Sequence, residues 1–341
     1  MPEGIDLDRF EPWAKAALPD LVGPFRCELI VGGRSNITAR IHDARGESVV
    51  LRRPPLHGVL ATAHDVLREY RIIAALTPTA VPVPAAMGYC DDPDVLGAPF
   101  YVMADVPGVV LHDGAAVSAE TDASSRREIG DSLVETLLAL HAVDIDAIGL
   151  GQLAKREGMI ARQLKRWKRQ LEATDVRDHR LMLHIHDQLE AKIPAQRATC
   201  LVHGDFRLGN VIVDRPGKVR ALLDWELATL GDPLADVGYL LATWDEPGDG
   251  ERFNAASPTR VPGFPSRDAL LARYADGSGR DVSDVAFYVA FSFWRLGCIL
   301  VGVLARNLQG ATESIDPAQV EDLSGKIERC SEMAQRIVDQ L

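Results

Sequence analysis

The sequence has only five cysteines among 341 residues, and they are scattered without a Cys-x-x-Cys pair. This scarcity indicates neither a zinc site nor a disulfide framework, and it predicts a reducing, cytoplasmic location. Positive charge is also scarce, because 37 Lys and Arg against 49 Asp and Glu give a net charge of −12. A chain this acidic is not expected to bind nucleic acid or an anionic membrane as its main role.

Targeting and repeat signals are missing as well. The acidic N-terminus lacks a basic segment followed by an apolar run, so no signal peptide is expected. The longest apolar run, residues 285–305, approaches the length of a membrane span, but Arg295 lies at its centre. A charge there is costly in lipid, which favours a buried helix. No internal repeat or low-complexity segment occurs, and the length allows two domains or one bilobal unit.

The most informative stretch follows residue 200. Asn210 precedes an apolar strand at 211–213, residues 215–218 read as a turn, and a second strand at 219–223 leads to Asp224. In such a hairpin the residues flanking the two strands face each other, and cross-strand neighbours lie about 5 Å apart. The pattern therefore predicts that one cation could bridge Asn210 and Asp224.

A carboxylate, a carboxamide and a second carboxylate at one hairpin mouth suit phosphoryl transfer. That reaction needs Mg²⁺ held by oxygen ligands and a carboxylate that accepts a hydroxyl proton. The spacing His203-x-Asp205-x-x-x-x-Asn210 is that of a kinase catalytic loop, with Asp224 in the place of the metal-binding aspartate. The alternative is a loop of ordinary turn carboxylates, which the joint spacing disfavours.

Three short motifs give this region a family resemblance. They are His-Gly-Asp at 203–205, Asp-Trp-Glu at 224–226 and Gly-Asp-Pro-x-x-Asp at 231–236. Together they resemble the aminoglycoside phosphotransferase and choline kinase superfamily rather than protein kinases. The resemblance implies that Asp205 is the catalytic base and that Asn210 and Asp224 are Mg²⁺ ligands.

Other residues near this loop have supporting roles. Arg207 is a second catalytic candidate, because it could neutralise the charge of the transferred phosphoryl group; a structural salt bridge is the alternative. His203 is expected to organise the loop by hydrogen bonding. Asp236 is expected to hold the backbone amides of the loop, and Asp232 to cap the helix that follows.

The N-terminal third predicts an antiparallel meander at 27–31, 37–41 and 48–52. Its first turn lacks GxGxxG and is not a Walker loop, but its composition suits a phosphate-covering loop. The nucleotide-binding candidates in this turn are Gly33, Ser35 and Asn36. A plain hairpin turn is the alternative.

At the end of the third strand, where kinases carry a lysine, this chain has Arg52. A guanidinium binds phosphate bidentately, although its reach differs from that of an ammonium. Arg53 points to the opposite face of the strand, so only one of the two can face a nucleotide. A helix over 61–76 carries Glu69, the expected partner of Arg52.

A buried strand at 98–105 is expected to run into the hinge, where backbone groups near Met103 and Asp105 would meet the adenine edge. The predicted fold class is α+β, a bilobal protein-kinase-like fold. The small antiparallel-sheet N-lobe would span residues 1–106, and the mainly helical C-lobe residues 107–341.

The C-lobe is predicted to contain several helices and one long loop. Helices are expected at 126–141, within the basic stretch 155–169, and at 267–275, 283–306 and 316–340. The basic stretch is read as a solvated helix face, or as a surface that attracts an anionic substrate. Residues 245–268 read as a long exposed loop. Arg295 requires a buried ion pair or, alternatively, a substrate carboxylate.

These features predict an ATP- and Mg²⁺-dependent kinase that phosphorylates a small-molecule hydroxyl. Residues 51–55 and 63–69 most resemble the kinase-like domain fused to some acyl-CoA dehydrogenases. That resemblance implies a hydroxyacyl acceptor. The net charge of −12 argues against a nucleic-acid or membrane partner. One alternative is an aminoglycoside O-phosphotransferase, whose cationic substrate the acidic 245–251 loop could bind. The other is a nucleotide-binding pseudokinase, because Arg52 stands where kinases have a lysine. The sequence does not reveal the oligomeric state.

Overall fold

The structure is a computed structural model that describes residues 4–30, 36–54, 65–250, 252, 256–309 and 317–341. The chain divides into two compact units. The N-terminal unit comprises Met1–Gly108, Ile148–Leu150 and Arg220–Leu227, and the C-terminal unit comprises Val109–Ala147, Gly151–Val219 and Ala228–Leu341. The segment around Asp224 therefore groups with the N-terminal unit, although it follows the catalytic-loop motif in the sequence.

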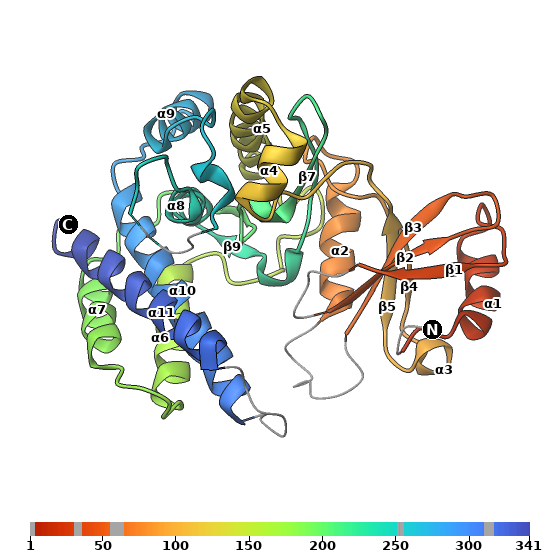
Figure 1. Cartoon of the computed structure of the whole chain (residues 1–341), viewed down its shortest axis with the longest axis horizontal. Coiled ribbons are helices and arrows are strands. Elements are labelled where there is room, and N and C mark those ends of the chain that lie inside the picture. The colour runs from red at the N-terminus through yellow and green to blue at the C-terminus, as the bar shows by residue number, and fades with distance from the viewer. Residues whose placement is uncertain (1–3, 31–35, 55–64, 251, 253–255, 310–316) are drawn as a thin grey trace. The chain divides into compact units, whose positions relative to one another are not determined.

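The N-terminal unit is built on a five-stranded antiparallel sheet with the strand order β1-β2-β3-β5-β4 (Figure 1). Its strands are β1 (Arg26–Leu29), β2 (Ile37–His42), β3 (Ser48–Arg53), β4 (Ala86–Cys90) and β5 (Phe100–Ala104). Its helices are α1 (Leu7–Ala17), α2 (Val66–Leu76) and α3 (Pro93–Leu96). The predicted meander is confirmed, whereas β4 and α3 were not foreseen.

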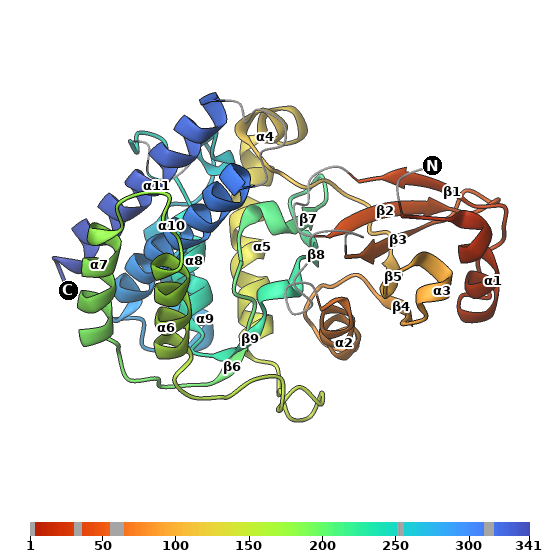
Figure 2. The same cartoon turned by 90° about the horizontal axis from the view of Figure 1, so that it is seen from below.

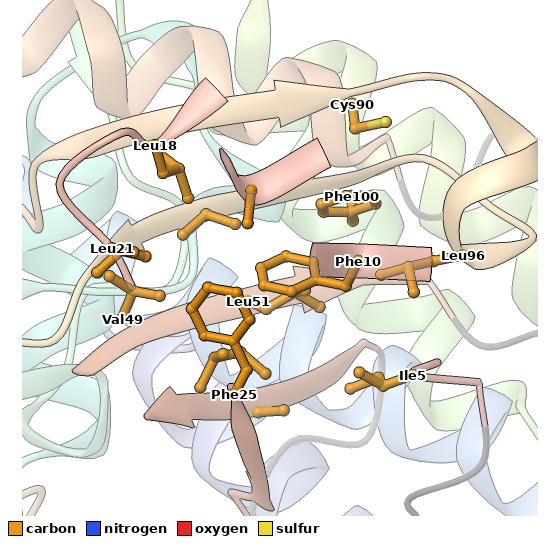
Figure 3. Packing of buried hydrophobic residues seen from close by; sticks show 14 residues of the cluster. Ile5, Phe10, Leu18, Leu21, Phe25, Val49, Leu51, Cys90, Leu96 and Phe100 are labelled. Atoms are coloured by element: carbon orange, nitrogen blue, oxygen red, sulfur yellow. The ribbon is translucent and has the colours of Figure 1, made fainter. Parts of the chain in front are cut away.

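One face of this sheet packs against α1 through a core of aromatic and aliphatic side chains (Figure 3). Phe10 lies 5.5 Å from Phe25 in an edge-on arrangement, and Leu51 of β3 is fully buried beside them. Side chains alternate between the faces of a strand, so Arg52 points away from the face that buries Leu51. The register of β3 thus leaves Arg52 free to serve the opposite face.

The C-terminal unit is mainly helical. Its helices are α4 (Gly114–Glu120), α5 (Ala123–His141), α6 (Met159–Glu172), α7 (Arg180–Ala191), α8 (Leu234–Thr243), α9 (Arg267–Ser278), α10 (Val285–Gln309) and α11 (Pro317–Val338). Two short antiparallel strands, β6 (Cys200–Val202) and β9 (Thr229–Gly231), pair with each other. Strand β7 (Val211–Val213) pairs with β8 (Val219–Leu222), which begins in this unit and ends in the other.

Helix α10 is the central element of the C-terminal unit, and it packs against α6, α8 and α11 (Figure 2). By length and composition Val285–Leu308 could cross a membrane, but 83% of its most apolar window is buried inside the fold. The prediction of a buried helix is therefore confirmed. Gly238 of α8 permits the close contact, because a Cβ there would lie 2.5 Å from the Cβ of Tyr288.

The structure corrects one part of the exposed-loop prediction for residues 245–268: residues such as Pro247 and Gly248 are exposed as expected, but Asp245 is buried. Asp245 is only 2% exposed, and its carboxylate lies 3.7 Å from Nη1 of Arg252 and 3.4 Å from Nε of Arg260. Asp249 is paired with Arg267 in the same way. Asp245 and Asp249 are therefore neutralised by arginines of the C-terminal unit.

Candidate active site

In the N-terminal unit, Arg52 is the centre of a cluster of charged side chains. Its Nε lies 3.1 Å from Oε2 of Glu69, and its Nη2 lies 2.7 Å from Oδ1 of Asp224. A third carboxylate, Glu226, is 4.0 Å away. The predicted pairing of Arg52 with Glu69 is confirmed. Burial lowers the pKa of Arg52, but the charges of Glu69 and Asp224 outweigh this and raise the pKa above its ordinary value.

Glu69 is fixed by two further hydrogen bonds. It is 1% exposed and accepts from Nδ2 of Asn36 at 3.0 Å and from the Tyr101 hydroxyl at 3.1 Å. Burial raises the pKa of the Glu69 carboxyl, an effect that Arg52 and these hydrogen bonds oppose. The network orients the Arg52 guanidinium, as a phosphate-binding cation requires.

Asp224 has an unusual backbone conformation. Its φ is +66°, and among the described residues it is the one non-glycine residue with a positive φ. Aspartate tolerates this region better than most residues, and such conformations cluster at functional sites. One carboxylate oxygen accepts from Arg52, and the other has no hydrogen-bond partner among the described residues. That oxygen is available to a metal ion.

The remaining nucleotide-binding predictions have different outcomes. Gly33 and Ser35 lie outside the described residues, and the Asn36 amide is directed to Glu69. Met103 lies within the sheet, in register with its neighbours on both sides. The Asp105 carboxylate is occupied by sheet residues. It accepts from Arg40 Nε at 2.6 Å and Ser48 Oγ at 2.7 Å, which outweigh the effect of burial and lower its pKa.

In the C-terminal unit, a loop between β6 and β7 carries the catalytic-loop motif. The fully buried Asp236 accepts hydrogen bonds from the backbone N–H groups of His203, at 2.7 Å, and Gly204, at 2.8 Å. Its predicted role in holding this loop is confirmed. Gly204 has a φ of +81°, which a side chain would disfavour. Burial raises the pKa of Asp236, but His141 and these backbone bonds lower it overall.

The loop orients Asp205 through neutral donors. Nδ2 of Asn210 donates to the Asp205 carboxylate at 2.7 Å and to the Asp205 carbonyl at 2.8 Å. The Asp205 N–H donates to Nδ1 of His203 at 3.2 Å, which gives that histidine the hydrogen-bonding role predicted for it. Arg207 Nε lies 3.6 Å from the Asp205 carboxylate. The spacing in the sequence thus brought Asp205 and Asn210 together, while their convergence with Asp224 stays a prediction.

Two residues of this cluster were not predicted to hold the loop. Tyr239 of α8 donates a hydrogen bond to Asp205, and burial, then Asp205, raises its pKa above the ordinary value. Arg295 of α10 donates to the Gly204 carbonyl, and its guanidinium lies 4.9 Å from the Tyr239 ring centroid. The position of Tyr239 one helical turn after Asp236 was an available signal, because residues three apart share a helix face.

Each unit holds an oxygen atom of the kind that Mg²⁺ prefers. In the C-terminal unit, the Asn210 carboxamide donates its nitrogen to Asp205, and no hydrogen bond to its oxygen is found among the described residues. In the N-terminal unit, it is the second carboxylate oxygen of Asp224.

Residues 26–287 match the family model described as the phosphotransferase enzyme family. The chain belongs to this family. Its relatives include acyl-CoA dehydrogenase family member 10 of Mus musculus, with 35% identity over 337 residues that cover 97% of this chain and 31% of the relative. Acyl-CoA dehydrogenase family member 11 of Rattus norvegicus is 32% identical over 92% of this chain and 41% of its own length. The chain thus spans less than half the length of these relatives.

Solved structures agree with the family. A crystal structure of a Ralstonia eutropha protein, provisionally assigned as an aminoglycoside phosphotransferase, superposes with a TM-score of 0.82 at 31% identity and covers 98% of both chains. Aminoglycoside phosphotransferase APH(4)-Ia, in a ternary complex with AMP-PNP and hygromycin B, gives a TM-score of 0.61 at 16% identity over 95% of this chain and 97% of its own. The second likeness shows the fold alone. The predicted α+β kinase-like fold is confirmed.

Proposed function

We propose that the chain is an ATP- and Mg²⁺-dependent phosphotransferase that moves the γ-phosphoryl group to a hydroxyl of a small molecule. The observation that carries the proposal is the Asp205 carboxylate. It is oriented by Asn210 and Tyr239 on a loop that Asp236 holds through its backbone. A fixed carboxylate with neutral hydrogen-bond donors is suited to accept a proton from an incoming hydroxyl.

In this mechanism Asp205 orients the acceptor hydroxyl and takes its proton as the oxygen forms a bond to the γ-phosphorus. The bond from that phosphorus to the bridging oxygen breaks, and ADP leaves with the electron pair. Asn210 and Asp224 would hold Mg²⁺, which supplies charge neutralisation to the phosphates. Arg207 would balance the developing negative charge.

Nucleotide binding is assigned to the N-terminal unit. Arg52, oriented by Glu69, would bind the phosphates together with residues 32–36. The backbone N–H groups of Asp105 and Val106 have no hydrogen-bond partner among the described residues, so they would meet the adenine edge. AMP-PNP is bound in the structure of aminoglycoside phosphotransferase APH(4)-Ia, a neighbour of the same fold, and an adenine nucleotide is the donor that we propose here.

For the acceptor, we propose a hydroxyacyl compound, because relatives at 32–35% identity are acyl-CoA dehydrogenase family members. An aminoglycoside acceptor has less support, since Asp245 and Asp249 are already paired with arginines. A pseudokinase also has less support, because Arg52 makes the ion pair with Glu69 that a kinase requires.

The test measures ATP turnover and phosphoryl transfer with Mg²⁺ against hydroxy acids, hydroxy amides and aminoglycosides. Asp205→Ala is expected to lower kcat by about 10²–10⁴-fold while nucleotide affinity is retained. Asp178→Asn, which changes an exposed aspartate before α7, is the matched control and should leave turnover unchanged. Tight nucleotide binding without transfer to any acceptor, and with no effect of Asp205→Ala, would instead favour the pseudokinase.

A further inference from the structure

Arg295 is a buried cation without a counter-ion. It is 9% exposed, and among the described residues no carboxylate oxygen lies within 4.0 Å of its guanidinium. The buried ion pair expected for Arg295 is therefore not found among the residues that the structure describes. Burying a charge without a partner costs several kcal/mol. An arginine in this position therefore suggests that a ligand supplies the missing negative charge.

The contacts of Arg295 compensate this charge only in part. Its Nη2 donates to the Gly204 carbonyl, while its Nε is buried and has no hydrogen-bond partner in the part of the chain that the structure describes. The guanidinium lies 4.9 Å from the ring centroid of Tyr239 and 6.0 Å from that of Phe291. Stacking on aromatic faces stabilises a cation by about 0.5–2 kcal/mol. A guanidinium has five N–H donors, and among the described residues the Gly204 carbonyl accepts from one of those of Arg295.

Arg295 lies next to the residues that would position Asp205 for its reaction with the acceptor hydroxyl. It bonds the carbonyl of Gly204, the residue directly before Asp205. It also lies over the ring of Tyr239, whose hydroxyl bonds the Asp205 carboxylate. An anion bound by Arg295 would therefore lie close to the hydroxyl that Asp205 activates.

We propose that Arg295 binds an oxyanion on the acceptor itself, so that the substrate is a hydroxy acid with a carboxylate a few bonds from the phosphorylated hydroxyl. This inference rests on the proposed function and names its substrate class. A carboxylate matches the planar fork of a guanidinium through two parallel hydrogen bonds. A bound carboxylate would also give the Arg295 guanidinium a direct anionic partner, whereas the Asp205 carboxylate is hydrogen-bonded to the neighbouring Tyr239.

The chain offers a close control for Arg295. Arg252 also stacks on an aromatic ring, 5.3 Å from the centroid of Phe293, and donates to a backbone carbonyl, that of Trp244, at 2.8 Å. Unlike Arg295, it has carboxylate partners, Asp245 and Asp249, at 3.7 and 3.8 Å. Arg252→Met therefore removes a stacked arginine without removing the proposed anion site.

The experiment compares hydroxycarboxylates of four to eight carbons with hydroxyamides of the same skeletons. Binding is measured by titration calorimetry on the full chain, and phosphoryl transfer in parallel. The wild-type chain should bind acids more tightly than amides. Arg295→Met should weaken acid binding by about 30-fold or more, the effect of removing one partner of a buried charge pair, and leave amide binding unchanged. Arg295→Lys should retain part of the preference, and Arg252→Met all of it.

Several outcomes would overturn the inference. One is equal binding of acids and amides by the wild-type chain. Another is an equal fall in kcat for both substrate types in Arg295→Met, which would show that Arg295 only positions the loop. A third is a loss of nucleotide affinity instead of acid affinity. Because the binding arm needs no turnover, acid-selective binding without any phosphoryl transfer would count against the proposed function alone. If Arg295→Met does not fold, Arg295→Lys still reports through its acid-to-amide ratio.

Discussion

In the N-terminal unit, Arg52 is held by the side chains of Glu69 and Asp224. In the C-terminal unit, by contrast, Asp236 holds the backbone N–H groups of His203 and Gly204. The first cluster joins a strand, a helix and a turn through side chains, whereas the second fixes the path of one loop. Both bury charge, but they use it for different purposes.

The difference shows what each cluster is able to do. Side chains that neutralise one another can exchange partners when a charged ligand arrives, which suits the binding of a nucleotide's phosphates. A loop held through its backbone cannot exchange partners without breaking the turn, which suits a base that must be preorganised. Asp205 benefits, because its carboxylate is oriented by Asn210 and Tyr239 without being neutralised by them.

The largest expected effect concerns stability. Asp236→Asn should lower the free energy of unfolding by about 3–5 kcal/mol, because a fully buried carboxylate that is hydrogen-bonded to His141 and to two backbone N–H groups is lost. Glu69→Gln, which keeps an acceptor for Asn36 and Tyr101, should cost about 1–2 kcal/mol. Urea unfolding followed by circular dichroism measures both. Equal costs would contradict the distinction between backbone and side-chain anchoring.

The same comparison has a pH dependence. The folded-state pKa of Asp236 is lowered, so its contribution is present above the unfolded value of about 3.9 and is lost as pH falls through the folded value. The difference in unfolding free energy between wild type and Asp236→Asn should therefore narrow below about pH 4. A gap that stays constant down to the folded pKa would mean that the carboxylate charge is not what holds the loop.

An intermediate effect is expected on nucleotide affinity. Arg52→Met should weaken binding of ATP with Mg²⁺ by about 10–100-fold, the loss of a charge-assisted contact, and Arg52→Lys should weaken it less. Arg53→Met is the matched control, because Arg53 is fully buried on the other face and donates to the Leu96 carbonyl at 2.8 Å. The Arg53→Met variant should have a lower free energy of unfolding, but its ATP affinity in a fluorescent-nucleotide titration should be unchanged. If both variants bind ATP alike, Arg52 is not the phosphate-binding residue.

Much of the fold followed from local signals in the sequence. Alternating apolar residues gave the meander of β1, β2 and β3, and helical periodicity gave α5, α10 and α11. The short spacing between Asp205 and Asn210 was enough to bring them together, since five residues allow little freedom. Short elements such as β4 and α3, of five and four residues, were missed because their patterns are weak.

The rest depended on contacts between distant parts of the chain. Arg295 and Gly204 are 91 positions apart, and nothing local in either segment indicates that they meet. Asp245 looked exposed because its neighbours are polar and rich in glycine and proline. Its burial is made possible by Arg252 and Arg260, arginines that a composition argument does not place. Charge compensation of this kind is a property of tertiary structure.

The smallest expected effect concerns Asp105, a carboxylate of the N-terminal unit whose side chain is bound within the sheet. Its partners Arg40 and Ser48 lower its pKa, so its contribution is present above about pH 3.9 and is lost as pH falls through the folded value. Asp105→Asn should reduce the unfolding free energy at neutral pH by about 1 kcal/mol, since the pair is partly exposed. The nucleotide affinity of Asp105→Asn should stay within about twofold of wild type, because only the Asp105 backbone is proposed to contact adenine. Loss of a charge-assisted contact between the Asp105 side chain and the nucleotide would instead weaken binding by about tenfold or more. A large loss of affinity at unchanged stability would assign adenine recognition to the side chain instead.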